Sequence, residues 1–371
     1  MAANHPECDM GPHGNSTKPE YSKAFEQDLL SHLDEQRIFR PAMRSQDVVK
    51  FIFQAMLGVG HLLSSRERVR DYILREMDSV HSDPSEPLCE TLSPSWIRLN
   101  LRRAKAEQIE PDTIARLMLP SQQTMQFTRQ DVFEVCKRAT RFFVEDNTDR
   151  AELAHILDES WLPSHSDTYK KEYHPAYRVI PAQWLPYMDA VKRISRKKGC
   201  TDRLLITLDG PCASGKTTLA QKLSVVFRSP VIHMDDFVIP HAQKTSERLA
   251  MPGGNCDAER LEEEVVKPWK QGVSVKYRKY DCCTDGFLPE ETLPDSDMLI
   301  IEGCYCNLPQ IRRHADICLF LDAPWNLRKN RLEQRETPAS MSMFYERWIP
   351  LEEAYFRAYK LPNDTMLCIG P

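Results

Sequence analysis

The chain has 371 residues, of which 28% are charged and 41% hydrophobic, and its formal net charge at pH 7 is -5. The chain is longer than a typical domain with one hydrophobic core, which predicts two domains. Its slightly negative net charge argues against a protein that binds nucleic acid through a basic surface. The sequence starts without a basic segment followed by an apolar one, and no stretch reaches the roughly 18 apolar residues of a membrane span. We therefore expect a cytoplasmic protein with neither nucleic acid nor membrane as a partner.

The twelve cysteines are scattered along the chain, so they do not suggest a disulfide framework. Cys282 with Cys283, and Cys304 with Cys306, lack the CxxC spacing of zinc ribbons and redox motifs. We expect reduced thiols and no structural metal.

The first part of the chain divides into a tail and a mainly helical segment. Residues 1–20 are rich in Gly, Pro, His and Asn without a period, which predicts a disordered tail. Residues 21–162 are predicted to be mainly helical, because apolar residues from Val48 to Leu57 recur at steps of three and four and stop at Gly58.

Two further helix starts follow from capping patterns. Ser64 with Glu67, and Thr128 with Asp131, have the spacing of a capping box ahead of apolar residues at helical steps. His61 follows the glycine-broken helix without an acid or cysteine at ligand spacing, so we interpret it as a structural histidine.

Residues 163–200 are predicted to form a connector and a linking helix. The segment after Trp161 contains prolines and tyrosines without a period, and Tyr169, Tyr173 and Tyr177 lack an interleaved basic stripe. We interpret these tyrosines as packing residues, and the linking helix is expected at about Ala182 to Arg196.

Residues 201–371 show short apolar runs separated by helical ones. This alternation predicts an α/β domain with a parallel five-stranded sheet and helices on both faces, preceded by the mainly α-helical segment. Ligands of such sheets gather where strands end, and Asp209, Asp235 and Glu302 all lie at the ends of predicted strands. The five runs are RLLITLD (Arg203–Asp209), PVIHM (Pro230–Met234), MLIIE (Met298–Glu302), ICLFLD (Ile317–Asp322) and TMLCI (Thr365–Ile369).

The stretch LDGPCASGKTTLA contains the GxxxxGK[ST] pattern, also called Walker A, between a predicted strand and a predicted helix. Such a loop directs backbone N–H groups at a β-phosphate, and Lys216 would reach the β/γ oxygens while Thr217 would hold Mg²⁺. A glycine-rich turn with an incidental lysine is the alternative, but it leaves the spaced glycines unexplained. The predicted nucleotide-binding residues are Gly210, Pro211, Cys212, Ala213, Ser214, Gly215, Lys216, Thr217 and Thr218.

The remaining motifs favour a small-molecule kinase over other nucleotide proteins. The NKxD stretch with which GTPases bind guanine is absent, and Glu302 is followed by Gly303 rather than by a second acid as in motor ATPases. Phosphoryl transfer requires an acceptor base, an acid for magnesium and cations on the developing charge.

The sequence has a candidate for each of these three parts. Asp235 in HMDDF is placed to accept the proton of an acceptor hydroxyl, and Glu302 is placed near magnesium. For both acids the alternative is an ordinary edge acid, solvated or paired with a lysine, and Asp236 could instead cap the next turn.

Arg328, Arg331 and Arg335 are the candidate cations. Their steps of three and four place them on one helix face, which could close over phosphates. The alternative is a solvated basic face that pairs with Glu333 and Glu336.

From Leu204 to Pro371 the chain resembles the uridine kinase-like branch of P-loop small-molecule kinases, kin to phosphoribulokinase and bacterial pantothenate kinase. The motifs that carry the resemblance are GPCASGKTT, HMDDF, MPGGNCDAERLEEEVVKPWKQG, YRKYDCCTDG, IIEGCY and WIPLEEAYF.

The resemblance implies ATP- and Mg²⁺-dependent transfer to a hydroxyl. It implies that Asp235 is the catalytic base and Glu302 the Glu-Gly strand end, with Lys216, Arg331 and Arg335 on the phosphates. Asp257 and Tyr280 match positions that hold the nucleoside, and Asp236 is a third candidate on the acceptor side. Where uridine kinases have a histidine after their Tyr-Asp pair, this chain continues CCTDG, with Asp285 near that place.

We therefore expect a small-molecule partner, and four hypotheses remain open. The chain could phosphorylate a nucleoside, or another acceptor such as pantothenate or a sugar. It could instead be a binding module whose contact with a partner depends on ATP, or an enzyme whose helical segment is regulated by the P-loop half. Acceptor-dependent turnover separates the kinases from the other two.

Overall fold

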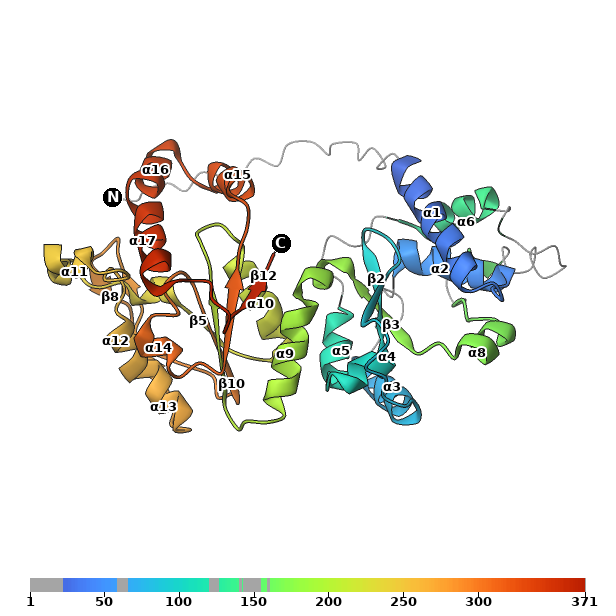
Figure 1. The fold of residues 1–371 in the computed structure, drawn as a ribbon, viewed down its shortest axis with the longest axis horizontal. Coiled ribbons are helices and arrows are strands. Elements are labelled where there is room, and N and C mark those ends of the chain that lie inside the picture. Colours follow the sequence, from blue (N-terminus) through green and yellow to red (C-terminus); the bar gives the residue numbers. More distant parts are fainter. Residues whose placement is uncertain are drawn as a thin grey trace, which may run out of the picture. The chain divides into compact units, whose positions relative to one another are not determined.

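The computed structural model describes residues 23–58, 66–119, 127–139, 142, 155–158 and 161–370 (Figure 1). The chain divides into two compact units. The helical unit comprises Met1–Gly58, Leu92–Trp96 and Ser121–Pro175, and the sheet unit comprises Val59–Thr91, Ile97–Pro120 and Ala176–Pro371. The predicted tail, His61 and Ser64 lie outside the described residues. The predicted domain limits at residues 162 and 200 stay predictions, because compactness within a folded chain does not show which segments fold independently.

The helical unit contains α1 (Lys23–Phe39), α2 (Ser45–Leu57), α6 (Arg129–Arg138) and α8 (Asp167–Tyr173). The apolar steps of three and four correctly predicted α2, whose Val48, Val49, Ile52, Phe53 and Met56 are all buried. The helix ends at Gly58, where φ is +60° and a Cβ would collide with the Trp96 ring. The capping box of Thr128 and Asp131 is confirmed at the start of α6.

A buried carboxylate ties two helices of this unit together. Asp47 in α2 is fully buried, and it accepts hydrogen bonds from the Ser166 backbone N–H (3.0 Å) and hydroxyl (2.6 Å) at the start of α8. The His165 Nδ1 lies 2.8 Å from the same carboxylate. Burial opposes the charge, but the hydrogen bonds from His165 and Ser166 outweigh it and hold the pKa of Asp47 below its usual value. The predicted connector is therefore ordered at its first turn.

The front of the sheet unit holds α3 (Arg66–Ser79), α4 (Leu101–Ala106), α5 (Pro111–Leu117) and a small sheet in the order β1 (Cys89–Thr91), β2 (Trp96–Asn100) and β3 (Tyr177–Pro181). The mainly helical character predicted before residue 162 is confirmed, but β1 and β2 were not expected. Four of the five residues of β2 are buried, so the strand has no alternating apolar pattern to reveal it.

The main sheet has the order β12-β11-β4-β10-β5, with all neighbours parallel, as predicted. Its strands are β4 (Leu204–Asp209), β5 (Val231–His233), β10 (Met298–Glu302), β11 (Ile317–Leu321) and β12 (Leu367–Ile369). Glu302 pairs in register with Leu208 on one side and with His233 on the other, so the strand ends that carry the predicted acids meet at one edge.

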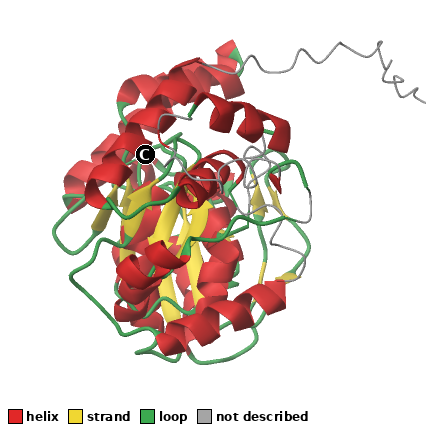
Figure 2. Cartoon of the chain, turned by 90° about the vertical axis from the view of Figure 1, so that its right-hand side faces the viewer, coloured by secondary structure: helices red, strands yellow, loops and turns green. Residues whose placement is uncertain are grey.

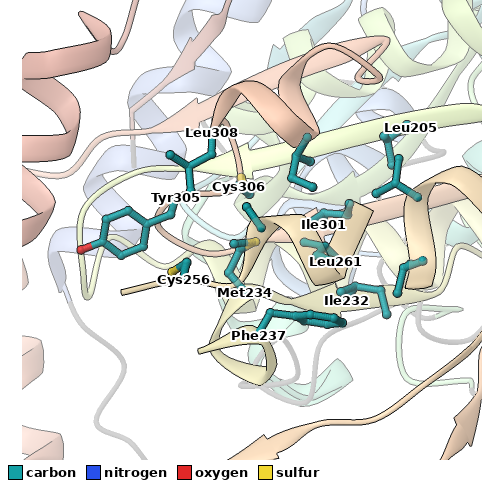
Figure 3. Close-up of a cluster of buried hydrophobic side chains, with 14 of the residues drawn as sticks. Leu205, Ile232, Met234, Phe237, Cys256, Leu261, Ile301, Tyr305, Cys306 and Leu308 are labelled. Carbon is teal, nitrogen blue, oxygen red and sulfur yellow. The ribbon is translucent and has the colours of Figure 1, made fainter. Parts of the chain in front are cut away.

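Helices cover both faces of this sheet (Figures 1 and 2). In Figure 1, α9 (Met188–Lys198) and α10 (Lys216–Phe227) lie to the right of the strands, and α12 (Ala258–Leu261), α14 (Pro309–Arg312) and α17 (Ile349–Tyr359) lie to the left. The expected linking helix is split into η2 (Ala182–Tyr187), which contains Pro186, and α9. Figure 3 shows the core on the α12 side, where Ile232 and Ile301 of the sheet meet Phe237 and Leu261.

The remaining elements pack around the sheet. On one side lie η3 (Met234–Phe237), η4 (His241–Gln243), α11 (Ser246–Ala250), η5 (Glu262–Val266), α13 (Lys267–Lys270) and two small hairpins, β6 (Lys276–Tyr277) with β9 (Glu291–Thr292) and β7 (Tyr280–Asp281) with β8 (Gly286–Phe287). A helical arm follows β11 and consists of α15 (Trp325–Arg335), α16 (Pro338–Met343) and η6 (Phe344–Trp348), which continues into α17.

Candidate active site

The backbone of the phosphate loop, residues 210–217, requires its glycines. Gly210 has φ +140°, and a Cβ there would collide with the Leu321 carbonyl oxygen of the neighbouring strand. Gly215 has φ +106° and immediately precedes α10. Side chains rarely adopt such angles, so the loop keeps its shape because glycine occupies these positions. The loop thus lies between β4 and the amino terminus of a 12-residue helix, where backbone N–H groups favour an anion.

The side chain of Lys216 folds back over the phosphate loop that precedes it. Its side chain is almost completely buried, and Nζ donates to the Pro211 carbonyl oxygen at 2.9 Å. With this single protein acceptor among the described residues, the ammonium group retains two donors that a phosphate oxygen could use. The residue is therefore placed as the sequence predicted, and its role on the phosphates stays a prediction.

Two side chains from different elements reach the Glu302 carboxylate. The Thr217 hydroxyl donates to the Glu302 Oε1 at 3.0 Å, and the His233 Nδ1 lies 2.6 Å from the same oxygen. Hydrogen bonding to Glu302 is the largest cause that raises the pKa of His233 above its usual value. The sequence did not single out His233, although its position at the end of β5, in register with Glu302, is the signal that could have found it.

Asp235 and Asp236 follow β5 in the short 3₁₀ turn η3. Asp235 is solvent-exposed as a residue, yet protein atoms around its carboxyl group desolvate it, and together with the Glu302 charge this raises its pKa. Lys216, His233 and Arg335 act in the opposite direction. These effects place Asp235 in the electrostatic field of the loop lysine and of Glu302, as expected for a candidate base.

Asp236 has different surroundings from Asp235. It is half-buried, and its Oδ2 has no hydrogen-bond partner among the described residues. Desolvation is the main cause that raises the pKa of Asp236, and Lys279 is the largest opposing charge. The turn therefore presents two carboxylates with distinct environments, as is common where acids have separate tasks.

The arginine face of α15 contacts the outside of the phosphate loop. Arg331 donates to the carbonyl oxygens of Ala213 (3.0 Å) and Ser214 (2.8 Å), and Arg328 donates to the Cys212 carbonyl oxygen at 3.4 Å. Arg335, at the end of the helix, pairs with Glu336 at 2.7 Å. Two of the three arginines are thus close to the loop, and Arg335 remains the most exposed of them.

The carboxyl group of Asp209, fully buried, lies beneath the loop. It accepts hydrogen bonds from the Gly210 backbone N–H (2.7 Å), the Tyr355 hydroxyl (2.7 Å) and the Asn307 backbone N–H (3.2 Å). Burial is the largest effect on Asp209 and raises its pKa despite these donors. These contacts fix the first turn of the loop to β4 and to α17.

A second carboxylate from α17 reaches the loop. The Glu352 Oε2 accepts the Cys212 backbone N–H at 2.9 Å, and desolvation raises the pKa of this buried group. Glu352 and Tyr355 are three residues apart, so they share one helix face. Both residues belong to the motif WIPLEEAYF, but no sequence pattern predicted a role for either of them.

The predicted acceptor residues are engaged in contacts with other protein groups. Asp257 caps α12 by accepting the Arg260 backbone N–H at 3.1 Å, and it pairs with the Arg260 guanidinium at 3.2 Å. Its own backbone N–H donates to the Phe237 carbonyl oxygen at 2.7 Å, which places it beside the Asp235 turn. Tyr280 donates its hydroxyl to Asp285. Their role in binding an acceptor stays a prediction.

A cavity of about 220 Å³ opens on the other side of the loop. Both charged and apolar side chains surround it, so it could hold a flat ring with polar edges. Its lining residues are Pro211, Phe320, Asp322, Arg328, Ile349, Glu352, Glu353, Phe356 and Pro362.

The described part of the chain offers no clustered metal ligands. Within it, no group of three or more His, Cys, Asp or Glu side chains is arranged to hold an ion, and the cysteines described are free thiols. Nor does any described helix combine the length and apolar character needed to cross a membrane. Thr217 and Glu302 supply two adjacent oxygens, which fits Mg²⁺, because this ion usually takes few protein ligands and completes its shell with water and phosphate.

The segment that contains this site is similar to a known protein family. Residues 205–338 match the model of the phosphoribulokinase / uridine kinase family. This segment of the sheet unit is thus similar to that family of P-loop kinases. The matched segment includes the phosphate loop, HMDDF, Glu302 and the arginine helix, so the predicted fold class is confirmed.

Solved structures similar to this chain include two that are described as bacterial kinases. A possible uridine kinase from Bacillus stearothermophilus is 23% identical, with 49% of this chain and 100% of that chain covered and a TM-score of 0.37. A putative fructose transport system kinase from Silicibacter sp. TM1040 is 24% identical, with 45% and 89% covered and a TM-score of 0.37. No curated protein matches the sequence.

Proposed function

We propose that this chain transfers the γ-phosphate of ATP to a hydroxyl group of a small molecule, and that a nucleoside is the first acceptor to test. One observation supports the proposal: the phosphate loop is surrounded by Lys216, Thr217, Glu302 and Asp235. The Thr217 hydroxyl donates a hydrogen bond to Glu302, and the charges of Glu302 and Lys216 both act on the pKa of Asp235. This combination provides the cation, the oxygen pair and the base that phosphoryl transfer needs.

On the donor side, the loop amides and the amino terminus of α10 bind the β-phosphate, and Lys216 neutralises the β/γ oxygens. Thr217 and Glu302 would hold Mg²⁺, which when bound supplies a positive charge on the phosphate oxygens. The cavity beside Pro211 takes the nucleotide base, and Arg328 at its wall can stack on it. Arg331 and Arg335 approach the transferring phosphate when the helical arm closes.

On the acceptor side, Asp235 accepts the proton of the attacking hydroxyl. Its raised pKa brings the group closer to neutral pH than an ordinary aspartate, so proton transfer becomes more favourable. Asp236, Asp257 and Tyr280 line the same side as candidate acceptor contacts.

Turnover with a panel of acceptors tests this function. Purified full-length protein is given Mg²⁺-ATP and one of uridine, cytidine, D-ribose, D-fructose or pantothenate, and ADP release is followed. We expect one acceptor to raise ADP release well above background, and Asp235→Asn to reduce it by about 10²- to 10⁴-fold. Asp189→Asn, on the exposed start of α9, is the matched control and should be unchanged. Tight ATP binding without turnover by any acceptor would favour the nucleotide-gated binding module instead.

A further inference from the structure

An unusual polar group lies in the loop that follows α11. Asn255 is only 8% exposed, and its side-chain Oδ1 has no hydrogen-bond partner among the described residues. Tyr305 lies nearby: burial raises the pKa of its hydroxyl, and the Asn255 side chain acts in the opposite direction. Buried amide groups are nearly always fully paired, so a missing partner marks a place where a ligand can supply one.

The loop around Asn255 is held rigidly. Arg248 donates from Nε to the Gly254 carbonyl oxygen and from its terminal nitrogen to the Cys256 carbonyl oxygen, both at 3.0 Å. Gly253 has φ +75°, and a side chain at Gly254 would collide with the Arg248 carbonyl oxygen. The loop therefore cannot readily turn Asn255 toward solvent or toward another protein group.

Tyr305, the neighbour of Asn255, has a strained backbone. Its φ is +79°, which aromatic residues rarely adopt, and its side chain is 6% exposed. Its ring packs on Tyr355 with 4.9 Å between centroids, and Tyr355 in turn bonds to Asp209 beneath the phosphate loop. Backbone strain of this kind persists where surrounding structure enforces it, often at binding sites.

The pair lies on the Asp235 side of the phosphate loop. Cys256 forms an antiparallel β-bridge with Val238, and the Asn255 carbonyl oxygen accepts a hydrogen bond from the Ile239 N–H at 3.1 Å. The segment with Asn255 therefore runs antiparallel to the residues that follow HMDDF. The Asp235 charge acts on the Cys256 thiol and, together with burial, raises its pKa. In Figure 3 Cys256 lies beside Met234, and the Tyr305 hydroxyl points away from the apolar cluster.

We propose that Asn255 and Tyr305 form a specificity-determining pair that hydrogen-bonds a second hydroxyl group of the acceptor, next to the one that receives the phosphate. The inference rests on the proposed kinase function and deepens it.

The choice of a hydroxyl group follows from the amide. In either orientation of the Asn255 amide, one of its two polar ends lacks a protein partner. The ligand must therefore either donate a hydrogen bond to the amide oxygen or accept one from the amide nitrogen. A hydroxyl group both donates and accepts, and it can also take the Tyr305 hydroxyl proton. A ring N–H or a carbonyl oxygen of a base would suit only one of the two arrangements.

Tyr305→Phe and Asn255→Ala test the pair with the acceptor that gives turnover in the panel. Tyr305→Phe keeps the ring packed on Tyr355, and Tyr187→Phe, in the same unit, is the matched control. We expect the KM for the acceptor to rise by about 10- to 100-fold in both variants, because the loss of one hydrogen bond weakens substrate binding by about this factor. The KM for ATP should stay within about twofold of the wild-type value.

Analogues of the same acceptor that each lack one hydroxyl group give the decisive readout. Wild type should reject one analogue by about 10- to 100-fold, and Tyr305→Phe should no longer distinguish that analogue from the parent acceptor. If Tyr305 had only a structural role, Tyr305→Phe would weaken the binding of the parent acceptor and of every analogue by the same factor. That result would overturn the inference while leaving the kinase function intact. An unchanged acceptor KM in both variants would do the same. No turnover of any acceptor by wild type would instead overturn the proposed function, and this inference with it.

Discussion

The Thr217 hydroxyl and the Glu302 carboxylate, 85 residues apart in the chain, are joined by a 3.0 Å hydrogen bond at the carboxyl edge of the sheet. The first belongs to the opening turn of α10 and the second ends β10, the strand beside β4. A divalent cation would take the place of this hydrogen bond, since both oxygens are suitable ligands. Under the proposed function, the phosphate loop would therefore meet the metal ion at these two residues.

Glu302→Gln should reduce phosphotransfer by at least about 100-fold and raise the Mg²⁺ concentration needed for half-maximal rate. The amide removes one negative charge from the metal position, and electrostatic stabilisation of the transferred group is worth several kcal/mol. Titration of Mg²⁺ at saturating ATP measures both effects. Glu333→Gln, on the exposed surface of α15, is the control and should behave as wild type. An unaltered Mg²⁺ requirement in Glu302→Gln would remove Glu302 from the metal site.

The rate should fall on the acid side at a higher pH than an ordinary aspartate would give. Desolvation and the Glu302 charge raise the pKa of Asp235, so the base becomes protonated as the pH falls through this raised value. Arg335 lowers the same pKa, and Arg335→Ala should therefore move the acid limb of the kcat/KM profile further toward neutral pH. A profile measured for both proteins checks the direction. An acid limb that moves toward lower pH in the variant would contradict the assignment of Asp235 as base.

Lys216→Ala should abolish the thermal protection that ATP gives. A ligand at about 100 times its Kd stabilises a protein by about 2.7 kcal/mol, and this gain disappears when affinity falls by two or more orders of magnitude. Melting curves with and without Mg²⁺-ATP provide the measurement. Lys197→Ala, at the exposed end of α9, should keep the full ATP-dependent shift. Equal protection in the two variants would show that the loop lysine does not contact the nucleotide.

The sequence predicted the parts of the site that are local in the chain. The spacing of Gly210, Gly215 and Lys216 identifies the loop. Asp235 directly follows one apolar run and Glu302 ends another, which places both acids at one sheet edge because parallel strands end together. Each of these predictions needs only a few consecutive residues and the rule that the carboxyl ends of parallel strands lie at one edge of the sheet.

The contacts from α17 could not be predicted in this way. Glu352 meets the Cys212 N–H from 140 residues further along the chain, and helical spacing shows that Glu352 and Tyr355 share a face but not what that face contacts. The strained angle at Tyr305 is equally invisible in the sequence, since no local pattern predicts a positive φ for a tyrosine. Tertiary packing decides both.

Asp47→Asn should destabilise the helical unit at neutral pH by about 2–3 kcal/mol, because hydrogen bonds to a buried charged group are lost. The folded pKa of Asp47 is lowered, so its contribution is fully present above the unfolded value of 3.8 and is lost as pH falls through the folded value. Urea unfolding at pH 7 and at about pH 3 should show the gap to wild type shrinking on acidification. Asp167→Asn, at a fully exposed position, should show no such gap, and a gap for Asp47→Asn that is independent of pH would contradict the charge-based explanation.

Tyr355→Phe should lower the stability of the sheet unit by about 1–3 kcal/mol, since Asp209 is fully buried and loses the donor that lies 2.7 Å from its Oδ2. The aromatic ring remains, so packing on Tyr305 is kept and the loss reports on the hydrogen bond. The melting transition that ATP shifts upward identifies the unit to be compared.

Tyr359→Phe, one helical turn further along α17, is the matched control, because its ring also packs on Tyr355 but its hydroxyl does not bond to Asp209. We expect it to stay within about 0.5 kcal/mol of wild type. ATP should also bind Tyr355→Phe more weakly than the control, because Asp209 holds the Gly210 N–H and with it the first turn of the loop. If both variants melt and bind ATP alike, the hydroxyl of Tyr355 does not fix the loop, and α17 supports it through ring packing and Glu352 alone.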